Sequence, residues 1–481
     1  MIIVASKDAT MIVYVPAGQW VMGRHGTGIP KDKKRQKFKE KEKCDENREC
    51  GTKDSCRQRG FPFLCRKKDM KRILLVAALM ATVSCGLEEV SRRPQSGAGD
   101  VWLGPGMNAG KDDPDKTVVY VTAVEYPEGY DWRTDREKGS VKCSLVVYAD
   151  DVPMMKVAAG DEYEVSTDPD MHRMVEGHLY TDYSTDAETV IKKDGKEVVR
   201  YAGREMICGL FVEDDDIYTL GHPRQGDGFS YRRNGDIVLE RSTGRSFANL
   251  HKDGGSICFS FMEPIEAQDS IIERYYLVRD NDIVQVAVRE DVRKVWDVIS
   301  YEGETIYLAS VIGVSSPVLF RSGSMHALEM PPMSEMLTCR LMADDGSFCM
   351  EGLYARKGKP LTSGLWDGRG KASFFDDGMT VASVCMNGDG VCCVLNGSSE
   401  KLKGVIYRCG ETFHMPPGYA SIGSSPAAMA DGILHVGLSS LSGGKPVVWK
   451  DGAVNQLDIN GFISTITVRE GRQSSQTSVL D

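Results

Sequence analysis

The sequence predicts an all-β protein, folded as a β-propeller of eight four-stranded blades and closed by its C-terminal strand. Three observations support this prediction. Two-residue turn signals recur at a nearly constant period, β-branched and aromatic residues flank them, and further short apolar segments precede each hairpin. Glycine accounts for 50 of 481 residues, roughly 10% against ~7% in an average protein, as expected for a chain rich in tight turns.

The turn signals fall between apolar segments that read as paired strands. Their successive spacings are 44, 40, 46, 42, 45, 42 and 42 residues. Asn-Gly and Asp-Gly supply the positive φ angles that two-residue hairpins require. The eight pairs are Asp150-Asp151, Asp194-Gly195, Asn234-Gly235, Asp280-Asn281, Ser322-Gly323, Asp367-Gly368, Cys409-Gly410 and Asp451-Gly452.

Two further apolar segments precede each hairpin, such as the strand that begins at Ile217. Four short strands in roughly 43 residues is the strand number and repeat length of a propeller blade. The first unit lacks its leading strand, and a spare strand, Phe462–Val468, follows the last unit. We therefore expect the C-terminal strand to complete the first blade of a propeller over residues 118–470. Seven blades is the alternative, whereas a pair of β-sandwiches would not explain the period.

A targeting segment is predicted ahead of the propeller. Lys71 and Arg72 precede a short apolar run from Ile73 to Ala81, and small residues follow, which is the layout of a secretory signal peptide over residues 70–84. The apolar run is too short to span a bilayer, and no stretch of 18 apolar residues occurs elsewhere.

The segment Val83-Ser84-Cys85 resembles the lipobox of bacterial lipoproteins, with Thr82 where that family usually has leucine. The resemblance implies that the Cys85 sulfur accepts a diacylglycerol, so that the acyl chains hold the protein on a lipid bilayer. Glu88-Glu89 resembles the acidic export tags of surface lipoproteins. We therefore expect an outer membrane lipoprotein, periplasmic or surface-exposed, with the leaflet left open.

The flanking segments differ in composition from the propeller. Residues 1–69 hold 17 Lys and Arg against 9 Asp and Glu, and the other 412 residues hold 42 against 60. We expect residues 1–69 to be an upstream extension outside the mature protein, 86–117 a flexible tether rich in Gly, Pro and Ser, and 471–481 a disordered tail. A main body this acidic repels phosphate backbones, which excludes nucleic acid as a partner.

The cysteines after the anchor do not form a disulfide framework, because they are nine and scattered among strands. We interpret most of them as small buried hydrophobic residues. Two pairs are symmetric about turns, Cys339 with Cys349 and Cys385 with Cys392, and each pair is a candidate for facing across a hairpin.

The predicted binding residues lie in a long loop of the first unit. Tyr126, Tyr130 and Trp132 are the candidate contacts, because their rings could stack on a sugar or anchor a partner protein. The competing interpretation is a loop that folds back over the mouth of the ring. The sequence identifies no catalytic residue, no metal ligands and no cofactor motif.

The aromatic residue before the turn in Val447-Val448-Trp449-Lys450-Asp451-Gly452 gives the repeat a resemblance to lipoprotein propellers common in gut-type Gram-negative anaerobes. The resemblance marks fold rather than activity. We expect a monomeric, membrane-anchored envelope lipoprotein whose propeller is a non-catalytic binding or scaffold module for a glycan, peptide or partner protein. The alternative is a propeller-fold glycan hydrolase or lyase, with carboxylates converging on the axis.

Overall fold

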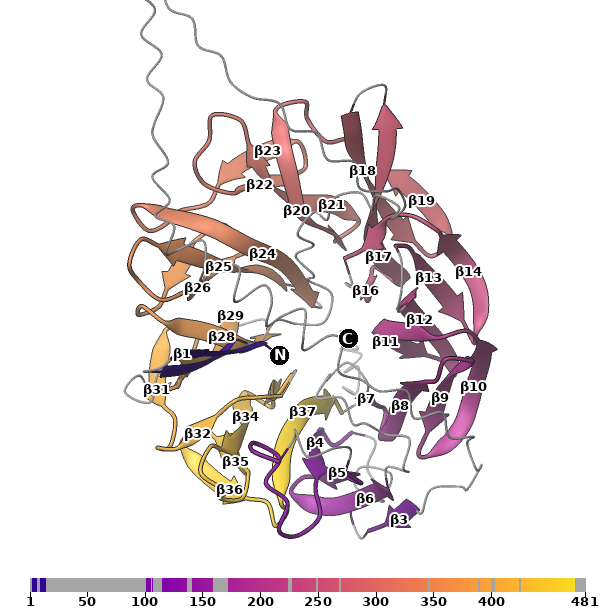
Figure 1. Ribbon diagram of the computed structural model, residues 1–481, viewed down its shortest axis with the longest axis vertical. Helices are drawn as coiled ribbons and strands as arrows, with labels where there is room; N and C mark the ends of the chain where they lie inside the picture. Colours follow the sequence, from indigo (N-terminus) through magenta and orange to yellow (C-terminus); the bar gives the residue numbers. More distant parts are fainter. Residues whose placement is uncertain are drawn as a thin grey trace, which may run out of the picture. The chain divides into compact units, whose positions relative to one another are not determined.

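The computed structural model describes residues 2–6, 9–13, 101–104, 106, 115–135, 141–158, 172–223, 227–247, 250–267, 270–344, 347–387, 390–398, 403–423 and 425–471. Among these residues the elements are β-strands, arranged as an eight-bladed propeller and one separate hairpin (Figure 1). None of the described segments forms a helix with the length and apolar character needed to cross a membrane. Met1–Trp20 and Gly97–Asp481 form one compact unit.

The strands of blades 1 to 4 are given from the inner to the outer edge of each sheet. Blade 1 is β37 (Gly461–Arg469), β4 (Val118–Glu125), β5 (Ser144–Ala149), β6 (Val152–Ala158) and β3 (Val101–Leu103). Blade 2 is β7 (His172–Val175), β8 (His178–Ser184), β9 (Glu188–Lys193) and β10 (Lys196–Ala202). Blade 3 is β11 (Glu205–Glu213), β12 (Asp216–Pro223), β13 (Phe229–Arg233) and β14 (Asp236–Arg241). Blade 4 is β15 (Arg245–Ser246) and β16 (His251–Asp253), β17 (Ser256–Ala267), β18 (Ser270–Arg279) and β19 (Asp282–Gln285).

The strands of blades 5 to 8 follow the same order. Blade 5 is β20 (Val292–Tyr301), β21 (Glu304–Val311), β22 (Val318–Arg321) and β23 (Ser324–Ala327). Blade 6 is β24 (Ser334–Asp344), β25 (Ser347–Arg356), β26 (Thr362–Asp367) and β27 (Ala372–Phe374). Blade 7 is β28 (Met379–Asn387), β29 (Gly390–Gly397), β30 (Val405–Arg408) and β31 (Glu411–His414). Blade 8 is β32 (Tyr419–Ala420) and β33 (Ala427–Ala430), β34 (Ile433–Ser440), β35 (Val447–Lys450) and β36 (Ala453–Gln456). The separate hairpin is β1 (Ile2–Ser6) with β2 (Ala9–Val13).

The C-terminal strand closes the ring as the sequence predicts. β37 pairs antiparallel with β4, from Gly461 opposite Glu125 to Arg469 opposite Val118. The eight-bladed prediction is thereby confirmed. The opposite, outer edge of the same blade carries β3, whose residues Val101–Leu103 belong to the segment expected as a tether.

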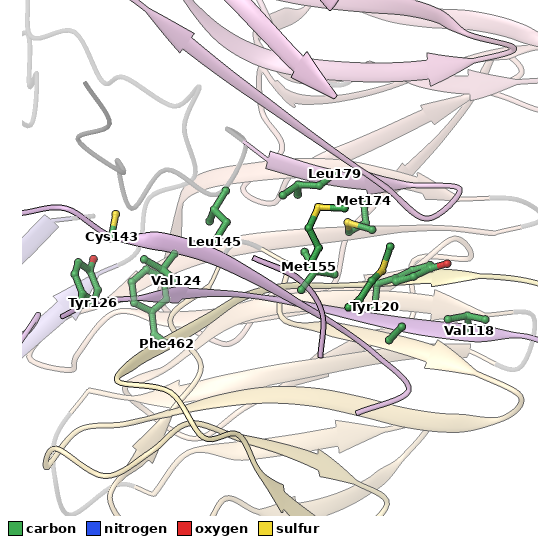
Figure 2. Close-up of a cluster of buried hydrophobic side chains, with 13 residues drawn as sticks. Val118, Tyr120, Val124, Tyr126, Cys143, Leu145, Met155, Met174, Leu179 and Phe462 are labelled. Carbon is green, nitrogen blue, oxygen red and sulfur yellow. The ribbon is translucent and has the colours of Figure 1, made fainter. Parts of the chain in front are cut away.

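Eight hydrophobic clusters fill the eight seams between neighbouring blades. Side chains alternate between the two faces of a strand, so each blade contributes one set to each adjacent seam. At the seam between blades 1 and 2, Val124 and Phe462 lie beside Tyr126 at one end, and Met174 of β7 reaches across towards Tyr120 (Figure 2). The ring is therefore a continuous chain of pairwise blade contacts.

The turn between the third and fourth strands does more than reverse the chain. In blade 4 the Asp280 carboxylate accepts the Ile257 N–H at 2.8 Å, and the Asp280 N–H donates to the Ile257 carbonyl at 2.8 Å. Asn234 binds Ile217 in the same way in blade 3. The Asp or Asn of the repeat thus caps the second strand of its own blade, which explains why these two residue types recur at this position.

Two local expectations are wrong. Asp367-Gly368 does not form a two-residue turn, because Asp367 accepts the N–H groups of Arg369 and Lys371 in a longer loop. Cys339 and Cys349 do not face one another, because Cys339 pairs with Gly352 and Cys349 with Met342. The hairpin closes with Asp344 opposite Ser347, and the two cysteines are not equidistant from this closing pair.

We predict that Asp280→Ala lowers the free energy of unfolding by about 2 kcal/mol. The change leaves the N–H of buried Ile257 without its acceptor, and places alanine at a φ of 52°. The control Asp280→Asn keeps an oxygen in place, as Asn234 does, and should stay within about 0.5 kcal/mol. Equilibrium denaturation in urea measures both variants. Equal losses in the two variants would contradict the capping role.

Candidate binding face

The order of the strands divides the propeller into two faces. Successive strands are antiparallel, so connections between second and third strands emerge on the same face as connections between blades. We call this the loop face. The hairpin turns such as Asp194-Gly195 emerge on the opposite side, which we call the turn face. The predicted aromatic residues follow β4 and therefore belong to the loop face.

The aromatic loop is folded onto the first blade. Tyr126 is 7% exposed, and its ring lies 5.1 Å from that of Tyr130 and 6.3 Å from that of Phe462. The Trp132 ring lies 5.3 Å from Phe462. Tyr130 and Trp132 are half-buried. The three predicted residues therefore do come together, around a side chain of the closing strand, and two of them keep part of their surface open to solvent.

Polar contacts hold this loop across the closure of the ring. The Asn460 side chain donates to the carbonyls of Pro127 and Tyr130 at 2.8 and 3.0 Å. Arg133 binds both carboxylate oxygens of Asp131 at 2.7 and 2.8 Å, and reaches the Ser440 carbonyl of blade 8 at 3.3 Å. The hydrogen bonds from Arg133 lower the pKa of the Asp131 carboxyl. The loop is thereby fixed as a bridge between blades 1 and 8.

A second feature of the loop face was not predicted from the sequence. Ile271 and Ile272 are 67% and 50% exposed near the end of the β17–β18 hairpin, whose pairing continues to Ala267 opposite Ser270. Ile312 and Met333 are 56% and 94% exposed on the β21–β22 and β23–β24 connections of the same face. Four large apolar side chains therefore lie exposed at three connections of this face in blades 4 to 6. The signal for them in the sequence was the pair of adjacent isoleucines, Ile271-Ile272, at the start of β18.

Two carboxylates of low exposure, Asp297 and Glu205, are engaged in structural bonds. Asp297 accepts the N–H groups of Val298 and of Leu341 in the next blade, both at 2.8 Å, while burial raises its pKa to about 7. Glu205 accepts a hydrogen bond from Arg232 at 2.7 Å and one from Ser230 at 2.5 Å. Their present role is to hold strands and blades together.

One serine–histidine pair has the hydrogen-bond arrangement of a nucleophile and its general base. Ser246 Oγ lies 2.8 Å from His222 Nε2, and His222 Nδ1 lies 2.9 Å from the Gly228 carbonyl. A carbonyl partner at Nδ1 fixes the proton there and leaves Nε2 as an acceptor for the serine hydroxyl. Burial lowers the pKa of His222, which favours the neutral ring. Ser246 is only 1% exposed, so a substrate cannot reach its hydroxyl, and we interpret the pair as structural.

Buried polar atoms gather at the inner part of the seam between blades 1 and 2. Thr122 lies opposite Thr465 in the closing pair of strands, and His172 shares its side of β7 with Met174, which packs in this seam. The Thr122 and Thr465 hydroxyls and His172 Nε2 have no hydrogen-bond partner among the described residues. Burial lowers the pKa of His172 to about 4.

The predicted lipid-attachment residue, Cys85, and the signal peptide lie outside the described residues. Within the described residues, no group of three His, Cys, Asp or Glu side chains is placed to hold a metal ion.

The solved structures similar to this chain share little sequence with it. No family model matches the chain, and no curated protein matches it. The β-propeller domain of the Trilobed protease from Pyrococcus furiosus is similar over 63% of this chain and 95% of its own, with 9% identity and a TM-score of 0.39. An acylaminoacyl peptidase from Pyrococcus horikoshii is similar over 69% of this chain and 55% of its own, with 10% identity and a TM-score of 0.40. A GH43 endo-arabinanase from Bacillus licheniformis is similar over 40% of this chain and 90% of its own, with 13% identity and a TM-score of 0.23.

We predict that His172 makes the protein less stable as the pH falls from about 6.5 to about 4. Within this window the unfolded chain binds a proton that the folded His172 does not, so unfolding is favoured at lower pH. The expected loss is about 3 kcal/mol at the acid end. His172→Asn should reduce the pH dependence of the unfolding free energy, whereas the exposed His326→Asn should leave it as in the parent protein. An unchanged slope in His172→Asn would rule out this histidine as its source.

Proposed function

We propose that this protein is a membrane-tethered binding module that docks a partner protein through the loop face of blades 4 to 6. The observation that supports the proposal is the exposure of Ile271, Ile272, Ile312 and Met333 at three connections of one face. Large apolar side chains on connecting segments cost free energy in water, which a partner surface recovers by covering them.

The scaffold beneath these side chains is suited to binding. A closed ring with packed seams presents its connections at fixed positions, which reduces the ordering cost of association. The proposed partner is a protein of the cell envelope, since apolar anchors favour protein over sugar. Tyr130 and Trp132, which keep exposed surface above blade 1, are our proposed contacts for a ligand that stacks on aromatic rings, such as a glycan.

The tether is part of the proposal. Lipidation of Cys85 would place the propeller at the outer membrane, periplasmic or surface-exposed, with the segment up to Gly97 as a spacer. The protein would act as a monomer, because closure of the ring leaves each blade paired with its two neighbours.

We predict that a photo-crosslinking amino acid at Ile271 or Ile312 captures a discrete partner in the cell envelope, whereas the same group at Ile283 does not. Ile283 is the matched control because it is an exposed isoleucine on β19, the outer strand of the same blade. Replacing Ile271 and Ile272 together by Asp should abolish capture at position 312, and Ile283→Asp should preserve it. Gel electrophoresis and mass spectrometry of the adducts measure the result.

Two outcomes would contradict the binding face. Equal capture from positions 271 and 283 would indicate non-specific contact, and no capture from either would leave the exposed side chains without a partner. Release of sugar by the purified full chain in a hydrolysis screen would instead support the alternative, a glycan hydrolase or lyase.

We predict that Cys85→Ser abolishes incorporation of an alkyne-labelled fatty acid and moves the protein from the membrane to the soluble fraction. The serine hydroxyl is a far weaker nucleophile than the thiolate that accepts the lipid. The control Cys65→Ser lies ahead of the predicted signal peptide and should leave labelling and fractionation unchanged. Labelling that persists in Cys85→Ser would refute lipid attachment at Cys85. It would not bear on the binding proposal, which the crosslinking experiment tests.

A further inference from the structure

Blade 7 brings three cysteine side chains together near the turn face. Cys385 of β28 lies directly opposite Cys392 of β29 in the strand register, as the sequence suggested. Cys409 occupies the turn between β30 and β31, and its Sγ lies 3.8 Å from the Sγ of Cys392. Cys392 is completely buried, whereas Cys409 is exposed. The cluster therefore runs from the surface into the sheet.

The turn itself does not require a cysteine at this position. Cys409 has a φ of 46° and precedes Gly410, so it stands where the equivalent turns have an Asp or Asn that caps a backbone N–H. A thiol is a weak acceptor compared with a carboxylate or amide oxygen. The residue is therefore poorly suited to capping and is placed instead beside a second thiol.

The surroundings distinguish Cys392 from the other buried thiols of the propeller. Hydrogen bonds from the thiols of Cys385 and Cys409 lower the pKa of Cys392, while the same interaction and burial raise the pKa of Cys385. By contrast, burial raises the pKa of Cys393, the next residue along β29, well above its usual value. A thiol with a lowered pKa is the better nucleophile near neutral pH.

We propose that Cys392 and Cys409 form a reversible dithiol–disulfide site that reacts with an external disulfide. The Cys409 thiolate, having released its proton to water, attacks one sulfur of the external disulfide. A mixed disulfide forms on Cys409, and the first external thiolate leaves and takes up a proton. The Cys392 thiol then gives up its proton, and its thiolate attacks the Cys409 sulfur and forms the Cys392–Cys409 disulfide. The second external thiolate is expelled and takes up a proton. The two protein thiols are oxidised by two electrons, which reduce one external disulfide to two thiols.

Exposure assigns the order of these steps. Only Cys409 of the pair is open to an external sulfur, and buried Cys392 reacts only with a sulfur already delivered to Cys409. The neighbouring Arg408 binds Asp451 at 2.7 Å and the Gly432 carbonyl at 2.6 Å, both in blade 8. The disulfide would therefore fix the turn of blade 7 at a point that also contacts the next blade. This site does not depend on the proposed function.

The test is equilibration of the full chain in glutathione buffers of increasing oxidised fraction, followed by alkylation of remaining thiols and peptide mass spectrometry. In the unaltered protein we expect one peptide pair joined through Cys392 and Cys409, fully reversed by excess reduced glutathione. Peptide mapping separates these sulfurs from those of residues 1–85.

Three variants assign the roles. Cys409→Ser introduces the residue type that blade 5 has at the same turn position, Ser322. In this variant Cys392 should remain a thiol in all buffers. Cys392→Ser should stop at a glutathione adduct on Cys409, because the second attacking thiol is missing. Cys393→Ala, the matched control on the same strand, should form the Cys392–Cys409 disulfide as the unaltered protein does.

The opposite results overturn the proposal. A persistent glutathione adduct on Cys409 in the unaltered protein would show that Cys392 does not complete the exchange. Oxidation of Cys392 to the same extent in Cys409→Ser would show that Cys409 is not the point of entry. Full alkylation of both thiols in the most oxidised buffer would show that there is no such site.

Discussion

The pairing of β37 with β4 is the interaction on which the ring depends. A blade has two apolar faces, and each is covered only by the neighbouring blade, so a missing strand opens two seams. β37 serves both seams of blade 1, since Phe462 packs towards blade 2 while Ile463 and Ile466 pack towards blade 8. The two ends of the propeller are thus joined through a shared sheet, and the cost of bringing them together is offset by burial on both sides of one strand.

The seams are also joined by polar side chains that bind the backbone of the next blade. Ser260 donates to the Val298 carbonyl at 2.5 Å, and Arg173 donates to the Leu210 carbonyl at 2.5 Å. Asp297 repeats the arrangement one blade further on, with its carboxylate accepting from Leu341. A buried polar group costs free energy unless it is hydrogen-bonded, so each of these bonds is satisfied only when the two blades are in register. Apolar packing supplies the bulk of the seam stability, and these bonds fix the relative position of the blades.

The sequence was sufficient to predict the number of blades, their period and the closing strand, because these follow from local turn chemistry repeated at a constant spacing. It was not sufficient to predict features set by contacts distant in sequence. The inner strands of blades 4 and 8 are each divided in two, as β15 with β16 and β32 with β33. The register separates Cys339 from Cys349 but aligns Cys385 with Cys392, because it depends on which residues close each hairpin, Asp344 with Ser347 and Asn387 with Gly390. Of the candidate residues, the aromatic loop could be found as a long insertion, whereas the exposure of Ile271 depends on how far β17 and β18 remain paired.

The two faces of the propeller are under different constraints, and this difference guides the interpretation of unusual residues. On the turn face, the first turn residue adopts a positive φ and its side chain caps a strand, which restricts it to Asp, Asn or a close substitute. On the loop face, connections range from the short segment after Ala202 to the long one after Glu125, and no such capping pattern recurs among the described residues. Apolar residues there can vary with the partner at little cost to the fold. A departure from the pattern on the turn face is more informative, because it replaces a residue type that caps a backbone N–H elsewhere in the repeat. Cys409 is such a departure, and its Sγ lies 3.8 Å from the Sγ of Cys392.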